Sequence, residues 1–299
     1  MMRSLAAGVP GFMPGARSGN VIGGRGSVAI DWFYASAPPS PHRSVWDDIW
    51  RQPGLQTKDE RVLDRERRGP RWALINAAVE TEFGKISGLR TIELGSGRGD
   101  LSTLLAGKGA DVTLVDVSAP ALQHAESRFQ RHRLSARFVQ ADIRCDLVDL
   151  HGRFDVATSL GVIEHFRGSM RDRVIRAHYN LLRPGGVCII GVPNAACPPY
   201  RLWKLYLETV RWWPYGMEIP YTRRELGSRA RRSGFERIDV QCTGFWQSVG
   251  DFWCGGLAHR HMDWANVRSR CDRWWGANLL LIARRPGEGN RQNSCTSSF

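Results

Sequence analysis

The residues best suited to chemistry lie in one glycine-rich stretch, Thr91-Ile-Glu-Leu-Gly-Ser-Gly-Arg-Gly-Asp-Leu-Ser102. Its three glycines, Gly95, Gly97 and Gly99, alternate along a turn that follows an apolar run. Because glycine has no Cβ, a ligand can lie directly on such a turn and face the N–H groups of a following helix. Glu93 lies inside the apolar run, where a carboxylate is costly without a partner. The stretch therefore predicts a strand, a ligand-binding turn and a helix.

Two further carboxylates follow the next predicted strands. Asp116 comes 23 residues after Glu93, near the end of an apolar strand, where it could accept both hydroxyls of a ribose. Asp142 follows the third strand and could accept from the exocyclic amine of a base. Ligands of open parallel sheets bind beyond the carboxyl ends of the strands, so these side chains are expected at one site.

The glycine spacing argues against two common nucleotide sites. Nicotinamide-binding folds use G-x-G-x-x-G, but here the third glycine comes one residue early and Asp100 takes the sixth position. The sequence also lacks GxxxxGK[ST], which excludes a P-loop.

Alternating strands and helices are expected to position these residues. The predicted strands are Leu89–Leu94, Asp111–Val117, Ala136–Gln140, Phe154–Leu160 and Val187–Val192. The predicted helices are Arg71–Phe83, Asp100–Gly107, Ala119–His132 and Met170–Leu182, the last ended by Pro184-Gly-Gly186. This alternation predicts an open, mostly parallel sheet with helices on both faces.

The C-terminal third has a different pattern. Tyr200–Trp213 predicts an amphipathic helix with Trp203 on its apolar side and Lys204 on its polar side. Thr222 and Glu225 form a capping box that begins another helix. Phe235–Cys242 and Ala277–Ala283 read as two more strands, with an aromatic, irregular segment between them at 246–275.

The predicted organisation is a disordered leader at 1–45, one domain at 46–285 and a disordered tail at 286–299. Within the domain, residues 195–275 are expected to form an aromatic helical cap over the substrate. Trp46, Ile49 and Trp50 share one helical face, which fits either a helix packed on the core or a flap over the active site.

Composition narrows the class of protein. The net charge is +13, and residues 201–299 carry 16 Lys and Arg against 9 acids together with most of the tryptophans. Such a basic surface can meet nucleic acid, anionic lipid or an acidic substrate. Seven scattered cysteines without CxxC indicate reduced thiols in a cytosolic protein and no metal site, although Cys254 and Cys271 flank His259 and His261. The sequence leaves the oligomeric state open.

The motifs together resemble a class I S-adenosylmethionine-dependent methyltransferase, of the small-molecule type that includes quinone-biosynthesis enzymes. The resemblance covers roughly residues 70–195, and weakly extends to 285. It rests on Glu93-x-Gly-x-Gly-x-Gly99, Asp116, Ala141-Asp-Ile143, Phe154–Leu160, Glu164-His165 and Leu181-Leu-Arg-Pro-Gly-Gly186. It implies a Rossmann-like seven-stranded sheet whose last strand is antiparallel, and S-adenosyl-L-methionine as cofactor.

The resemblance also implies roles for single residues. The turn of Gly95, Gly97 and Gly99 would pack against the methionine and ribose, and Glu93 would hold the methionine ammonium. Asp116 would bind the ribose hydroxyls. The remaining contacts would come from Val117 and Ile143 against the adenine ring, Asp142 at its amine, and the backbone of Leu160 at the methionine.

The methyl acceptor is less constrained. Methyl transfer needs alignment and exclusion of water, and an alcohol or amine also needs a base. His165 is the candidate base, although a loop histidine that caps the sheet edge is the alternative. The sequence predicts transfer to an O or N of a small, amphiphilic or anionic molecule. Helix Tyr200–Trp213 fits either peripheral contact with a membrane or burial on the core. An RNA methyltransferase using the basic C-terminal third, and a binding protein with an inactive cofactor site, are the alternatives.

Overall fold

The computed structural model describes residues 41–52, 59–213, 215–254 and 269–287. The predicted leader before residue 41 and the tail after 287 lie outside this range, as does most of the Cys254–Cys271 segment. The first helix begins at Pro41, before the predicted start of the domain. No helix among the described residues is long and apolar enough to cross a membrane.

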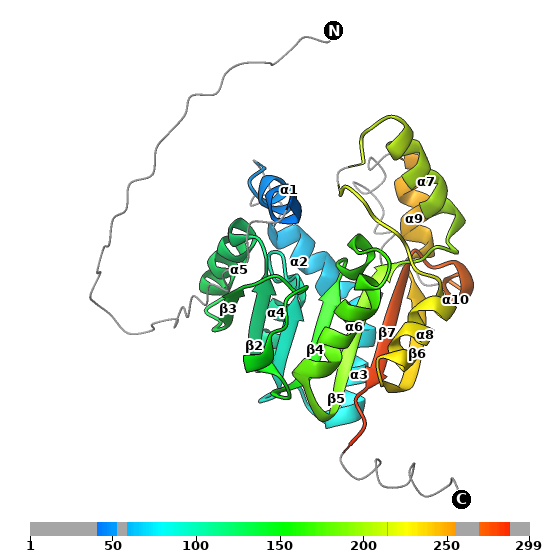
Figure 1. The fold of residues 1–299 in the computed structure, drawn as a ribbon. Coiled ribbons are helices and arrows are strands. Elements are labelled where there is room, and N and C mark those ends of the chain that lie inside the picture. Colours follow the sequence, from blue (N-terminus) through cyan, green and yellow to red (C-terminus); the bar gives the residue numbers. More distant parts are fainter. Residues whose placement is uncertain (1–40, 53–58, 214, 255–268, 288–299) are drawn as a thin grey trace, which may run out of the picture.

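A seven-stranded sheet forms the centre of the molecule (Figure 1). Its strands are β1 (Arg90–Leu94), β2 (Asp111–Asp116), β3 (Arg137–Gln140), β4 (Phe154–Leu160), β5 (Leu182–Pro193), β6 (Glu236–Thr243) and β7 (Asn278–Arg284). The order across the sheet is β3-β2-β1-β4-β5-β7-β6. β7 pairs antiparallel with both neighbours, whereas the pairs among β1 to β5 are parallel. The predicted Rossmann-like sheet with an antiparallel last strand is confirmed.

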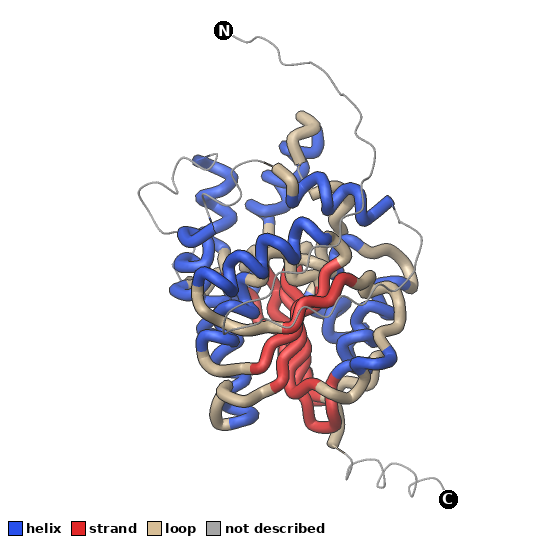
Figure 2. Tube along the Cα trace, turned by 90° about the vertical axis from the view of Figure 1, so that its left-hand side faces the viewer, coloured by secondary structure: helices blue, strands red, loops and turns tan. Residues whose placement is uncertain are grey.

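Helices cover both faces of the sheet, which Figure 2 shows nearly edge-on. On one face lie α3 (Pro70–Phe83), α4 (Asp100–Gly107) and α5 (Ala119–Arg131), whose side chains pack on Leu114 and Ile189. On the other lie α6 (Met170–Leu181) and α8 (Arg223–Arg232), which pack on Ile92 and Ile190. Adjacent residues of each strand point to opposite faces, so an apolar strand such as β5 supplies both cores.

The remaining helices precede the sheet in the chain or connect its strands. α1 (Pro41–Trp50) and α2 (Asp59–Arg68) precede it in the chain, and η2 (Val148–Leu150) and η3 (Ile163–His165) flank β4. α7 (Pro198–Thr209), α9 (Phe245–Cys254) and α10 (Asp272–Trp275) lie on the same side as the carboxyl ends of the parallel strands (Figure 1). The segment predicted to be irregular, 246–275, therefore contains helical residues.

One local prediction, the end of α6, is wrong. Helix α6 ends at Leu181 and Leu182 is already extended, so Pro184-Gly-Gly186 does not cap it. Those residues lie inside β5, where the pairing register with β4 shifts between Phe154 and Val156. Proline lacks an N–H and glycine lacks a side chain, and both are tolerated at such an irregularity. By contrast, the Thr222 half of the predicted capping box of α8 is present, because Glu225 N–H donates to Thr222 Oγ1 at 3.1 Å.

Lys204 is the second residue whose predicted environment is wrong. It was expected on the exposed side of its helix, but it is buried, ion-paired with Glu208 and 4.4 Å from the ring centroid of Trp213. A buried ammonium needs such partners. Apolar side chains on the other side of α7 are exposed instead, with Leu205 at 60% and Leu202 at 54% exposure.

Candidate active site

A cavity of about 280 Å³ opens at the carboxyl ends of β1, β2 and β4. Eight of the nine predicted cofactor residues line it: Glu93, Gly95, Gly97, Asp116, Val117, Asp142, Ile143 and Leu160. The candidate base His165 lines it as well. The sheet topology thus brings residues from four separate loops to one place, as expected for this type of sheet.

The three glycines do different things. All have positive φ, at 63°, 53° and 70° for Gly95, Gly97 and Gly99, a region that side chains disfavour. Gly99 does not line the cavity, and a Cβ there would lie 2.6 Å from Leu114 Cδ2, inside the core. A Cβ at Gly95 would lie 2.6 Å from Val162 Cγ2. The expectation that all three leave room for a ligand is therefore wrong for Gly99, which is required by packing.

Glu93 connects the strand to the start of helix α4. Its Oε2 accepts hydrogen bonds from the Ser102 N–H at 3.1 Å and the Ser102 hydroxyl at 2.6 Å. One N–H of the helix start is therefore used inside the protein, not toward a ligand as expected. Burial raises the pKa of Glu93 to about 8 despite these bonds. A ligand cation beside this carboxylate would favour its ionised form.

Asp116 holds the glycine turn in place. Its Oδ2 accepts from Gly97 N–H at 2.8 Å, and its Oδ1 accepts from Ser118 N–H at 2.9 Å. Burial raises its pKa to about 6. Each carboxylate oxygen has more than one lone-pair site, so both can accept a further hydroxyl. Asp116 thus fits a diol and also shapes the turn beneath it.

Asp142 has a partner that the sequence interpretation missed. The Arg144 guanidinium donates to both of its carboxylate oxygens, from Nε to Oδ1 at 3.0 Å and from Nη2 to Oδ2 at 2.5 Å. The Arg144 backbone N–H also donates to Oδ1, at 2.9 Å. Asp-x-Arg spacing is the only sequence signal for this pair. Asp142 lines the cavity, but its charge is shared with Arg144.

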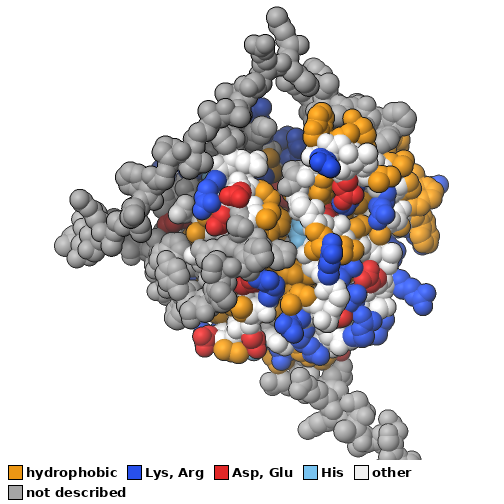
Figure 3. Space-filling model, turned by 45° about the horizontal axis from the view of Figure 1, so that its top comes forward, with side chains coloured by type: hydrophobic (Ala, Val, Ile, Leu, Met, Phe, Trp, Pro, Cys, Tyr) orange, Lys and Arg blue, Asp and Glu red, His pale blue; other side chains and the backbone are white. Residues whose placement is uncertain are grey.

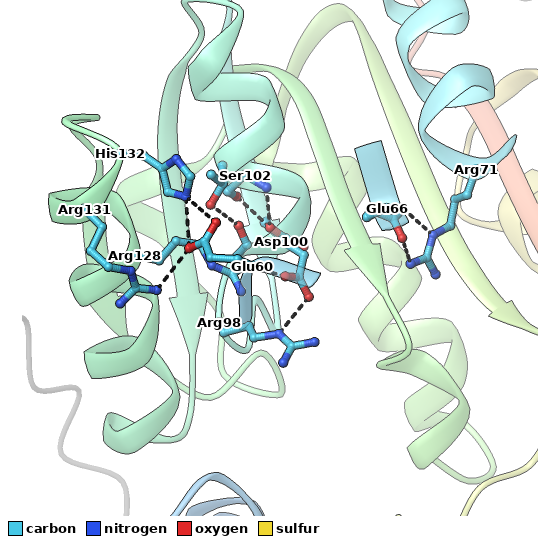
Figure 4. A network of polar contacts seen from close by, with 12 residues as sticks. Glu60, Glu66, Arg71, Arg98, Asp100, Ser102, Arg128, Arg131 and His132 are labelled. Carbon is cyan, nitrogen blue, oxygen red and sulfur yellow. Dashed lines mark hydrogen bonds and ion pairs between the residues drawn. The ribbon is translucent and has the colours of Figure 1, made fainter. Parts of the chain in front are cut away.

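A network of ion pairs surrounds the turn on its outer side (Figure 4). Asp100, the first residue of α4, pairs with Arg98 at 3.0 Å and with the fully buried Arg128 of α5. Arg71 of α3 donates to both carboxylate oxygens of Glu66, at 2.7 and 2.5 Å. Arg71, Arg98 and Asp100 also line the cavity. The Asp100 pair with Arg128 ties the end of the turn to α5, and the Arg71 pair ties α3 to α2.

Helix α1 packs beside α5 (Figure 1), and its Trp46 and Trp50 line the cavity. Trp50 lies so close to the turn that a Cβ on Gly97 would be 2.7 Å from Trp50 Cζ2. His124 of α5 bonds the Trp50 carbonyl at 2.8 Å, which ties the helix to the sheet domain. Trp46 contacts His165 edge-on, with ring centroids 4.9 Å apart. Of the two interpretations of this helix, the structure matches the flap.

His165 is buried beside the cavity and held by its backbone surroundings. Its Nδ1 lies 2.7 Å from the Met217 carbonyl oxygen, an acceptor only, so Nδ1 carries a proton. In the neutral ring Nε2 is then the basic nitrogen. This orientation suits a base and also a metal ligand.

Comparison with known proteins fits this geometry. Residues 92–186 match the model of a methyltransferase domain. These residues form a class I methyltransferase domain. A ubiquinone biosynthesis O-methyltransferase of Psychrobacter arcticus is 30% identical over 167 residues, which cover 52% of this chain and 62% of that enzyme. The match to a second Psychrobacter enzyme of that name covers 42% of its length, so the chain aligns with less than two thirds of these curated relatives.

Solved structures show the same fold across more of the chain. A phosphoethanolamine N-methyltransferase of Haemonchus contortus has a TM-score of 0.57 at 17% identity, covering 84% of this chain and 62% of that one. A didemethyltoxoflavin N1-methyltransferase of Burkholderia thailandensis has a TM-score of 0.52 at 18% identity, covering 85% and 93%. At these identities the likeness concerns the fold.

Proposed function

We propose that the protein transfers a methyl group from S-adenosyl-L-methionine to an oxygen or nitrogen of a small molecule. The observation that carries this proposal is the cavity itself. Its lining combines the buried Glu93 and Asp116 carboxylates and Gly97 with the side chains of His165 and Trp46. The methyltransferase domain that matches residues 92–186 supports the same assignment.

The residues of the cavity fit this cofactor. Glu93 is buried, and its raised pKa marks a carboxylate that an ammonium would stabilise. Asp116 offers two oxygens for a diol, and Ile143 and Val117 offer apolar contact for a base. When bound, the cofactor supplies an activated methyl group. The protein's part is to orient the acceptor, exclude water and accept a proton, for which His165 Nε2 is the candidate.

Calorimetric titration of the full chain with S-adenosylmethionine and S-adenosylhomocysteine tests the proposal. We expect one site, with affinity lowered by about 1–3 kcal/mol in Asp116→Ala through loss of charge-assisted hydrogen bonds. Asp111→Asn is the matched control, because Asp111 is exposed at the other end of the same strand. Absence of binding to the wild-type chain would overturn the assignment. A substrate screen with labelled cofactor then identifies the acceptor.

The proposed acceptor is amphiphilic, and we place its entry near α7. Apolar side chains on and after this helix are exposed, including Tyr206 at 56% and Trp212 at 71%. Figure 3 shows hydrophobic side chains at the upper right edge, where α7 lies in Figure 1. Exposed aromatics beside arginines such as Arg211 are typical of peripheral contact with anionic lipid.

Sedimentation with anionic and neutral vesicles tests this contact. We expect wild type to co-sediment with anionic vesicles and Trp212→Ala to do so less. Equal recovery of both proteins in the supernatant would contradict lipid contact without affecting the cofactor assignment. The comparisons do not favour the nucleic-acid alternative, since the relatives named above act on small molecules.

A further inference from the structure

A second polar cluster lies beside the cavity, on the side away from the glycine turn. Glu164 and His165 belong to η3, and Glu218 lies in the segment that leads to α8. One potential ligand atom from each of the three residues lies within 4.8 Å of those of the other two. Sequence spacing gave no sign of this cluster, because Glu218 is more than 50 residues from the other two.

Backbone hydrogen bonds fix the cluster from both sides. Ile219 N–H donates to the Glu164 carbonyl at 2.9 Å, and His165 Nδ1 donates to the Met217 carbonyl at 2.7 Å. The segment carrying Glu218 is therefore tied to η3 at the residues directly before and after it. The three side chains are held together by the fold and not by a chance encounter of exposed groups.

The burial of the Glu164 carboxylate is not explained by its hydrogen bonds. It is 2% exposed, and its Oε2 has no hydrogen-bond partner among the described residues. A buried carboxylate oxygen without a donor is costly, and the nearby Glu218 adds a like charge.

The positive charge of Arg171 acts on Glu164, but Arg171 does not bond the unpartnered oxygen. Its guanidinium donates to the Ile219 carbonyl at 3.3 Å, pairs with Glu225 at 3.2 Å and lies 3.4 Å from the Tyr221 ring centroid. Its own Nε is also without a hydrogen-bond partner in the described structure. Within the described part of the chain, no cation therefore bonds Glu164 Oε2.

We propose that Glu164, His165 and Glu218 bind a divalent metal ion. Imidazole and carboxylate are ligand types that Zn²⁺ and Mn²⁺ accept, and two negative charges balance the ion. The hydrogen bond from His165 Nδ1 to a carbonyl is the outer arrangement that orients Nε2 toward a metal. Tyr200, whose hydroxyl donates to Glu218 Oε1, is the internal competitor for that ligand.

The position of the ion suggests what it does, a step that rests on the proposed function. His165 also lines the cofactor cavity, so the ion lies between that cavity and α7. An acceptor hydroxyl bound to the ion would release its proton more readily, to water, because His165 Nε2 would be occupied as a ligand of the ion. The oxygen then forms a bond to the methyl carbon while the carbon–sulfur bond breaks, and the electron pair of that bond stays on sulfur. A hydroxyl-bearing acceptor is therefore favoured over an amine.

Metal binding is measured without cofactor or acceptor, on the untagged full chain stripped with EDTA. Titration with Mn²⁺ followed by electron paramagnetic resonance, and equilibrium dialysis with Zn²⁺, give stoichiometry and affinity. We expect one ion per chain, and a loss of affinity of about tenfold or more in both Glu164→Gln and Glu218→Gln. Tyr200→Phe should bind the ion as tightly as wild type or more tightly, because the competitor is removed.

Glu60→Gln is the matched control, an exposed acid of α2 that is outside the cluster. Its affinity for the ion should equal that of wild type. Glu218 is only half-buried, so its variant keeps the test valid if Glu164→Gln fails to fold. Fewer than one ion per chain at millimolar probe, or unchanged affinity in both Gln variants, overturns the proposal. S-adenosylhomocysteine binding in EDTA reports the cofactor site separately.

Discussion

At the scale of single residues, the buried carboxylate Glu93 has the clearest functional consequence. Its pKa of about 8 means that near neutral pH the empty site holds a largely protonated acid. A cationic ligand binds the ionised form better, so binding should draw a proton off this residue.

The affinity for S-adenosylhomocysteine should therefore rise with pH and level off above pH 8. The rise cannot exceed about tenfold per pH unit for one proton. Calorimetry between pH 6 and pH 9 measures it, and Glu93→Gln reports the titration of the ligand alone. An equal slope in both proteins would show that Glu93 does not sense the ligand.

The raised pKa of Glu93 also affects the stability of the fold, in the opposite direction to its effect on ligand binding. A folded-state pKa raised from 4.5 means that the folded protein holds the proton more tightly than the unfolded chain. Stability from this group is thus fully present below pH 4.5 and is lost as pH rises to 8. Without cofactor, Glu93→Gln should gain in Tm over wild type as the pH rises from 5 to 8. Saturating cofactor should reverse that order at pH 8, as thermal unfolding with and without ligand would reveal.

At the scale of elements, the glycine turn and α1 act as a pair. Gly97 is at a positive φ of 53°, and Trp50 leaves no room for a Cβ. Gly97→Ala therefore combines backbone strain with a clash, whereas Gly84→Ala has a similar φ of 78° and nothing within 4 Å.

Gly84→Ala should cost only the backbone strain, about 1 kcal/mol, in denaturant unfolding. Gly97→Ala should cost more and should also weaken cofactor binding. Gly97→Ala should lose more free energy of unfolding than Gly84→Ala because of the clash with Trp50. Adding Trp50→Ala to Gly97→Ala should recover this difference. Failure of the double variant to recover any stability would mean that α1 does not rest on the turn in solution.

The buried pair between α4 and α5 is a second element-scale contact. Arg128 is fully buried, pairs with Asp100, and its pKa is lowered to about 10 by burial. Arg128→Met leaves Asp100 without this partner and should lose about 3–5 kcal/mol of folding free energy. The exposed pair of Arg67 and Asp64 gives the reference, since Arg67→Met should change stability by less than about 1 kcal/mol. Urea unfolding of the two variants compares the pairs directly, and similar losses would refute the special role of Arg128.

At the scale of the whole molecule, the sheet and its ligand edge follow from the sequence. Strand Phe154–Leu160 and helix Asp100–Gly107 have the predicted bounds, because each combines a clear apolar period with a glycine or an acidic start. The Leu182–Pro193 strand was misjudged at its start, since Pro184-Gly-Gly186 reads locally as a helix end but forms an irregularity in the sheet.

The site was predictable only where a local motif marks it. Glu93, Asp116 and the glycines lie in strand-turn-helix units that sequence alone displays. Three other contacts arise from the folded structure, where no local motif marks them: Arg144 with Asp142, Trp50 with Gly97, and Glu218 with Glu164. Helical periodicity predicts that Lys204 is exposed to solvent, whereas tertiary packing against Trp213 buries it.

The place of β7 has a consequence for how the chain folds. The last strand of the sequence is inserted between β5 and β6, so Leu280 pairs with Gly191 on one side and Gln241 on the other. Until it arrives, β5 exposes an apolar edge able to pair with another chain. During synthesis from the N-terminus, β1 to β5 can assemble first, but the sheet closes only after residue 284 has emerged. Nascent chains stalled before β7 should therefore depend on chaperones, and those stalled beyond it should not.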